Sequence, residues 1–113
     1  MSGRIDFGPD PPRRIAPDVH VWIEDTTYAD APAVRVAERR LTGASYDGGA
    51  EGLPFTIEWD DRRRSPGRTY TIAAFVDVDR DGRPGPGDFV TTQAVRVPLP
   101  DVRVSVPVKR VGG

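Results

Sequence analysis

Short runs of alternating apolar residues, separated by glycine and proline, are the feature that most constrains the fold. The clearest run is 18–25, in which Val19, Val21 and Ile23 alternate with His20, Trp22 and Glu24. A period of two places the apolar side chains on one face of an extended strand. The chain has 12 Gly and 12 Pro among its 113 residues, spread between such runs. This pattern predicts an all-β domain with many turns.

Repeating this reading along the chain predicts about seven strands. They are a short first strand around Ile5 and Phe7, followed by strands within 18–25, 33–44, 53–59, 68–78, 89–97 and 102–108. Leu41 is out of phase with Val34 and Val36, which predicts a bulge or bend; a helical turn over 34–40 is the alternative. Pro107 cannot donate a main-chain hydrogen bond, so its strand is expected at a sheet edge or at a bulge.

We therefore expect one all-β domain, a β-sandwich of about seven mainly antiparallel strands. Residues 18–111 would form the sandwich. Residues 1–17 form a proline-rich N-terminal segment in which the first strand is expected.

An acidic segment follows the strand expected over 68–78. Asp77, Asp79, Asp81 and Asp88 occupy the first, third, fifth and twelfth positions of a twelve-residue loop, and Gly82 occupies the sixth. This is the ligand spacing of an EF-hand calcium loop, in which the seventh residue supplies a main-chain carbonyl. The predicted ligands are the carboxylates of Asp77, Asp79, Asp81 and Asp88 and the carbonyl of Arg83. The flanking residues read as strands, so the site would lie on a β-hairpin.

Two residues of the loop depart from the EF-hand pattern. Asp88 stands where EF-hands place a longer glutamate, and Pro84 lacks the N–H through which two such loops pair. A calcium sensor is therefore not expected, and the cation would have a structural role with an affinity of about 10⁻⁵–10⁻³ M. Mg²⁺ is the alternative cation. The alternative for the loop itself is a solvated turn, because Asp and Gly are common turn residues.

Composition limits the remaining function classes. The net charge is −1, which offers no broad basic surface for nucleic acid. There is no cysteine, which excludes disulfides and thiolate chemistry. No apolar stretch of about 20 residues and no signal peptide or lipobox is present. As written the chain is expected to be soluble, without membrane insertion; it would belong to the cell envelope or the exterior if an export signal has been removed.

No catalytic constellation is visible in the sequence. His20 is the only histidine, and it is expected on the surface beside Trp22. Trp22 and Trp59 are interpreted as core or inter-sheet anchors; an exposed Trp22 would instead indicate a contact patch. The acidic pair Asp60-Asp61 and the basic run 62–64 are interpreted as solvated loop residues. We expect a protein that is not an enzyme.

Several motifs together resemble the YbaY/YscW-like family. They are Glu24-Asp25-Thr26, Ala29-Asp30-Ala31-Pro32, Pro54-Phe55, and Gly87-Asp88-Phe89 leading into Thr91-Thr92-Gln93. The last of these, with the Asp77–Gly82 segment, is similar to the subgroup that carries a DxDxDG loop. Members are small bacterial β-sandwich domains, many of them envelope lipoproteins, and one branch serves as pilotins for the secretins of type III secretion. The resemblance implies the fold, and a domain that binds a protein partner rather than catalyses.

The prediction from sequence is therefore a non-enzymatic binding or assembly module with a structural calcium site in residues 77–88. The alternative is a pilotin-like envelope chaperone or interaction domain in which the acidic loop is only a solvated turn.

Overall fold

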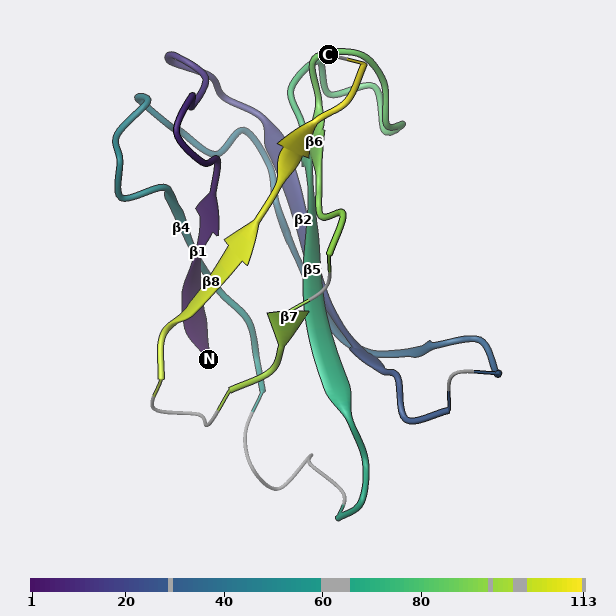
Figure 1. Cartoon of the computed structure of the whole chain (residues 1–113). Helices are drawn as coiled ribbons and strands as arrows, with labels where there is room; N and C mark the ends of the chain where they lie inside the picture. The colour runs from purple at the N-terminus through teal and green to yellow at the C-terminus, as the bar shows by residue number, and fades with distance from the viewer. Residues whose placement is uncertain (29, 60–65, 94, 99–101, 113) are drawn as a thin grey trace.

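Two β-sheets pack face to face in the computed structural model (Figure 1). The structure describes residues 1–28, 30–59, 66–93, 95–98 and 102–112. Its strands are β1 (Ser2–Asp6), β2 (Asp18–Asp25), β3 (Val34–Leu41), β4 (Leu53–Thr56), β5 (Tyr70–Asp77), β6 (Phe89–Val90), β7 (Val95–Arg96), β8 (Val104–Pro107) and β9 (Lys109–Arg110). The prediction of an all-β sandwich is confirmed. No helix in these ranges is long and apolar enough to span a bilayer.

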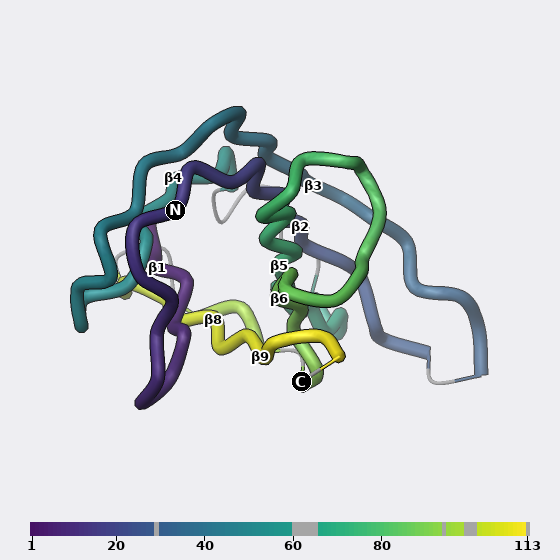
Figure 2. The backbone as a smooth tube through the Cα atoms, turned by 90° about the horizontal axis from the view of Figure 1, so that it is seen from above, coloured from purple at the N-terminus to yellow at the C-terminus, as the bar shows by residue number. Residues whose placement is uncertain are grey.

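The smaller sheet has the order β4-β1-β8, and the larger has the order β3-β2-β5-β6-β9, with β7 also paired to β5. All the described pairings are antiparallel except β1 with β8, which is parallel. The N-terminal segment 1–17 supplies β1, the middle strand of the smaller sheet, and Ile5 and Phe7 of this segment are buried in the core. Figure 2 shows the two layers from above, with the β5–β6 connection arching beside the larger sheet.

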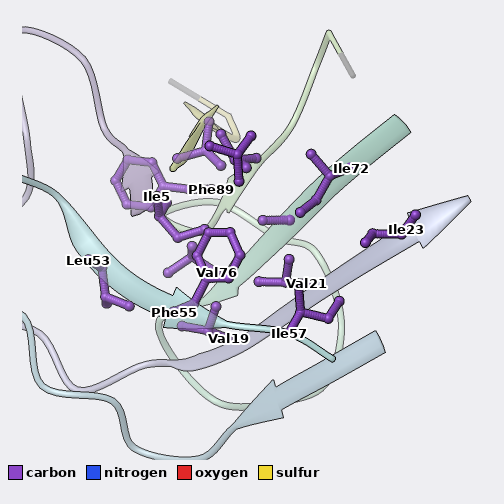
Figure 3. Packing of buried hydrophobic residues seen from close by; sticks show 14 of the residues in the cluster. Ile5, Val19, Val21, Ile23, Leu53, Phe55, Ile57, Ile72, Val76 and Phe89 are labelled. Carbon is purple, nitrogen blue, oxygen red and sulfur yellow. The ribbon is translucent and has the colours of Figure 1, made fainter. Parts of the chain in front are cut away.

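The core lies between the two sheets, where the apolar faces predicted from the alternation meet. Val19, Val21 and Ile23 of β2 belong to one buried cluster with Leu53 and Phe55 of β4 (Figure 3). Trp59 and Tyr70 close one end, with ring centroids 5.0 Å apart. The interpretation of Trp22 as a core anchor is wrong. Trp22 alternates with the buried residues of β2, so it lies half-buried on the outer face of the larger sheet.

The predicted irregularity in 33–44 is a bulge. Ile23 pairs with Ala37 while the next residue, Glu24, pairs with Arg35, which leaves Val36 as the extra residue in β3. This explains the phase change between Val36 and Leu41, because an extra residue reverses the face to which later side chains point. The segment forms a strand, so the alternative of a helical turn does not hold.

The single strand expected over 89–97 is divided into β6 and β7. At the division, the Thr91 amide donates to the Ala74 carbonyl over 3.0 Å. The hydroxyl of Thr91 then accepts the Ala74 amide over 2.9 Å, in the place of a main-chain carbonyl. This side-chain substitution interrupts the regular ladder with β5.

The terminal run 102–108 changes sheet. β8 is an edge strand of the smaller sheet, as Pro107 predicts, and Val108 donates to the Asp6 carbonyl over 3.0 Å before the chain enters β9. β9 then pairs with β6 of the larger sheet, with Arg110 opposite Phe89 and Lys109 opposite Val90. The chain therefore joins the two sheets along one side and ends beside the β5–β6 connection (Figure 1).

Candidate metal centre

The acidic loop joins β5 to β6 at one end of the sandwich. β5 ends at Asp77 and β6 begins at Phe89, so the first and last predicted ligands are fixed by the sheet. The tip between them needs unusual backbone angles: Gly82 has φ 82°, and Arg80 has φ 60°, which is uncommon for a residue with a side chain. The local sequence supplies glycine at the first of these positions, and a residue distant in sequence supplies an ion pair at the second. The Arg80 Nε lies 3.4 Å from Asp18 Oδ1 at the start of β2.

The structure brings the four predicted acidic ligands together. One carboxylate oxygen from each of Asp77, Asp79, Asp81 and Asp88 lies within 4.8 Å of the others. Asp77 and Asp88 are buried, with 4% and 1% of their surfaces exposed, whereas Asp79 and Asp81 are exposed. Buried carboxylates come from the ends of the two strands and exposed ones from the tip, so the cluster is open to solvent on one side only.

Main-chain amides hold three of the four carboxylates in place. The Gly82 amide donates to Asp77 Oδ2 over 2.7 Å, and the Arg83 amide donates to Asp81 Oδ1 over 2.9 Å. Asp88 accepts from both sides of the loop, from the Val78 amide over 2.8 Å and the Gly85 amide over 3.0 Å. Each carboxylate oxygen has a second lone pair, so these bonds leave capacity for a cation.

One oxygen of the cluster, Asp77 Oδ1, differs from the bonded carboxylate oxygens described above. It is buried, and it has no hydrogen-bond donor among the described residues. A buried acceptor without a donor costs free energy, on the order of 1–3 kcal/mol and more for a charged group. A bound cation would satisfy it.

The pKa values of the two exposed aspartates reflect the crowding of negative charge in the cluster. The pKa of Asp79 is raised, first by hydrogen bonding to the Asp77 carboxyl, then by burial and by the charges of Asp81 and Asp88. A hydrogen bond between two carboxyls requires a proton on one of them, so it is lost when both are ionised. The pKa of Asp81 is lowered, first by the hydrogen bond from the Arg83 amide.

The fifth predicted ligand, the Arg83 carbonyl, stays a prediction. The residues gathered here fit a hard cation, because they offer oxygen atoms alone and no nitrogen or sulfur.

Two sets of contacts fix the loop from outside, and no sequence pattern indicated either of them. Asp18 Oδ1, which pairs with Arg80, also accepts the Gly43 amide over 2.9 Å. The Asp88 carbonyl accepts the Val111 amide over 2.8 Å, and the Gly87 amide donates to the Val111 carbonyl over 3.2 Å. Both sets of contacts join residues that are distant in sequence, so no local sequence pattern predicts them.

The other polar side chains considered from sequence are paired on the surface. His20 Nε2 lies 2.9 Å from Glu38 Oε2, and this contact is the largest cause of the lowered pKa of Glu38. The Trp22 Nε1 donates to Glu24 Oε1 over 2.6 Å, and the Arg35 guanidinium lies 4.8 Å from the centre of the Trp22 ring. Residues 60–64 lie outside the described part of the chain.

Among the described residues, cavities lie beside the loop and beside the strands that it contacts. One of about 250 Å³ lies beside Asp77 and is lined also by Asp18, His20 and Arg40. A second, of about 460 Å³, lies between the turn after β1 and the last strand, with Phe7, Phe89, Lys109 and Arg110 in its walls.

Comparison with known proteins identifies the fold and no family. No protein-family model matches the chain, and no curated protein matches it. Among solved structures, the chain is similar to an alternative pilotin from the type II secretion system of Vibrio cholerae, with a TM-score of 0.71 and 22% identity. The match covers 100% of this chain and 96% of the pilotin chain. The chain therefore has the fold of this pilotin over its whole length; the resemblance to the YbaY/YscW-like family and its DxDxDG subgroup stays a prediction.

Proposed function

We propose that this chain is a non-enzymatic assembly module that binds a protein of the cell envelope, and that loop 77–88 holds one Ca²⁺ in a structural role. The full-length similarity in fold to a pilotin supports the first part. The second part is carried by Asp77, a buried member of the four-carboxylate cluster whose Oδ1 has no hydrogen-bond donor among the described residues.

The role assigned to the cation is mechanical. Ca²⁺ takes 6–8 oxygen ligands, and four carboxylates with one carbonyl supply most of them, with water completing the shell. Its charge would remove the repulsion within the cluster and would fix the end of β5 against the start of β6. Nothing in this role requires a chemical step.

A calcium titration tests the metal part. Chelator-treated protein is titrated with Ca²⁺ while the amide NMR signals of residues 77–88 and the Tm are followed. For affinities of about 10⁻³ to 10⁻⁵ M, 10 mM free Ca²⁺ stabilises the native state by roughly 1.4 to 4 kcal/mol. A parallel Mg²⁺ titration identifies the preferred cation. The proposal fails if 10 mM Ca²⁺ moves neither these amides nor the Tm.

The substitution Asp77→Asn separates a cation site from a solvated turn. It keeps an oxygen for the Gly82 amide and removes the buried charge, so in chelator we expect a Tm equal to or above that of the wild type. With Ca²⁺ the variant should lose most of the stabilisation. The matched control is Asp47→Asn, because Asp47 is also a turn aspartate, bonded to the Gly49 amide over 3.0 Å, but lies outside the cluster. An equal calcium response in both variants contradicts the proposal.

The module part is tested by direct binding. By analogy with the pilotin, the first partner to assay is a purified secretin of a type II secretion system. An unrelated β-sandwich domain, assayed against the same secretin, is the control. We expect saturable binding by biolayer interferometry with a Kd in the micromolar range or tighter. No binding to secretin at a protein concentration of about 100 μM would exclude this partner.

A further inference from the structure

Asp88 belongs to two bonding systems at once. Its side chain lies in the acidic cluster and accepts the Val78 and Gly85 amides. Its main-chain carbonyl accepts the Val111 amide, at the end of the chain. Because the residue is 1% exposed and both groups are hydrogen-bonded, we expect movement of its side chain to disturb its carbonyl. A displacement of the carboxylate therefore displaces the acceptor on which the C-terminal residues depend.

The last strand is held by its pairing with β6 and by the Arg110 guanidinium, which lies 5.4 Å from the centre of the Phe89 ring. β9 consists of Lys109 and Arg110, both exposed, and forms the edge of the larger sheet. Its neighbours on the loop are Gly87, whose amide bonds Val111, and Pro86, against which Gly112 lies. A strand that buries so little apolar surface is held mainly by its hydrogen bonds, and such segments open locally before the rest of the domain.

Without a bound cation, repulsion within the acidic cluster favours movement of loop 77–88 away from its present position. Four carboxylates repel one another, and Asp77 Oδ1 lacks a donor among the described residues. Movement of Asp88 away from the cluster would relieve the repulsion but would break the bonds to Val111.

We infer that cation occupancy of loop 77–88 and docking of the C-terminal strand β9 on β6 are thermodynamically coupled, through Asp88. The inference rests on the proposed calcium site and adds its regulatory consequence. Cation binding favours the docked strand, and by linkage the docked strand raises the affinity for the cation by the same factor. Lys109 and Arg110 of β9 line the cavity of about 460 Å³. By favouring the docked strand, the cation therefore also favours the closed wall of this cavity.

Amide hydrogen exchange tests the first direction. Exchange of the Gly87 and Val111 amides is compared in chelator and in 10 mM Ca²⁺, with the Ile57 amide, bonded to Met1 over 2.9 Å, as the reference for global stabilisation. We expect Val111 to gain at least tenfold more protection than Ile57. Equal gains at both positions would overturn the coupling, because global stabilisation alone produces them.

The substitution Val111→Pro tests the reverse direction. Proline removes the N–H that bonds the Asp88 carbonyl, and the matched control Val111→Ala keeps it. We expect the proline variant to bind Ca²⁺ about tenfold more weakly, and the alanine variant to match the wild type. If Ca²⁺ shifts the 77–88 amides with the same affinity in both variants, the coupling is wrong and the calcium site stands. If Ca²⁺ shifts no amide in the wild type, both proposals fail.

Discussion

Gly82 occupies a backbone conformation that residues with a side chain rarely adopt. Its φ is 82°, and a Cβ built there would meet no atom within 4 Å. The requirement for glycine is therefore conformational, with no contribution from crowding. The Gly82 amide also donates to the buried Asp77 carboxylate and so fixes its orientation.

We expect Gly82→Ala to lower the free energy of unfolding by about 1 kcal/mol, because an L residue is strained at this φ. Urea unfolding in chelator measures the loss. Gly85→Ala is the control: this glycine has no positive φ, and its Cβ would lie 3.9 Å from Asp88 Oδ2, an ordinary contact. Equal stability of Gly82→Ala and the wild type would contradict the conformational argument.

Asp25 shows how local hydrogen bonds set a pKa at the far end of β2. Its Oδ1 accepts the Thr27 amide over 3.0 Å and the Thr27 hydroxyl, and Arg68 lies 3.2 Å from Oδ2. The hydrogen bonds from Thr27 are the largest causes that lower the pKa of this carboxyl. The stabilisation that Asp25 contributes is thus present above the unfolded pKa, about 3.9, and is lost as the pH falls through the lower folded value.

Carboxyl ¹³C NMR titration should place the Asp25 pKa below about 3.9 in the wild type. Thr27→Ala should raise the Asp25 pKa towards that value, because it removes the hydroxyl that donates to the ionised carboxylate. Thr26→Ala should leave it unchanged. A wild-type midpoint at or above 3.9 would show that these bonds do not stabilise the ionised form.

At the scale of elements, β1 lies between two neighbours, and it accommodates them through Gly3. This residue pairs with Phe55 of β4 and Val104 of β8. A Cβ on Gly3 would lie 2.5 Å from Val104 Cγ1 and 2.7 Å from Phe55 Cζ, closer than such atoms pack. The glycine thus permits the close approach of side chains from both adjacent strands.

Gly3→Ala should therefore destabilise the protein by about 1–3 kcal/mol, as overpacking of a core does. Thermal unfolding checks this, with Ser2→Ala, at an exposed position of the same strand, as the control. A loss no larger than that of the control would mean that β1 can shift to admit a methyl group.

At the scale of the whole molecule, one core serves both sheets. Val76 of β5 and Val106 of β8 belong to different sheets, are fully buried, and lie in the same hydrophobic cluster. The sheets are also joined covalently where β8 continues into β9. The two layers should consequently unfold together.

Val76→Ala and Val106→Ala should each lower the free energy of unfolding by roughly 2 kcal/mol. In urea, far-ultraviolet circular dichroism and tryptophan fluorescence should give one coincident transition with an unchanged m value. Val102→Ala, at a residue that is 47% exposed, should change the stability by less than about 0.5 kcal/mol. Separate transitions for the two probes would refute a shared core.

Most of the fold could be predicted from local pattern. The period-two alternation in 18–25 identifies both the strand and its buried face, because a pleated strand has only two faces. The edge position of β8 follows from the missing N–H of Pro107, and the bulge in β3 follows from the change of phase between Val36 and Leu41. The division between β6 and β7 could not be predicted, since it depends on the Thr91 hydroxyl meeting Ala74 of another strand.

The sequence by itself determined the alternating core faces, the turns, and the spacing that lets four aspartates meet, because each depends on residues close together in the chain. Only the tertiary structure decided the parallel pairing of β1 with β8 and the docking of Val111 on Asp88. It also decided that Asp77 Oδ1 is buried without a described donor. These features depend on which distant segments become neighbours, and that is set by packing of the whole core.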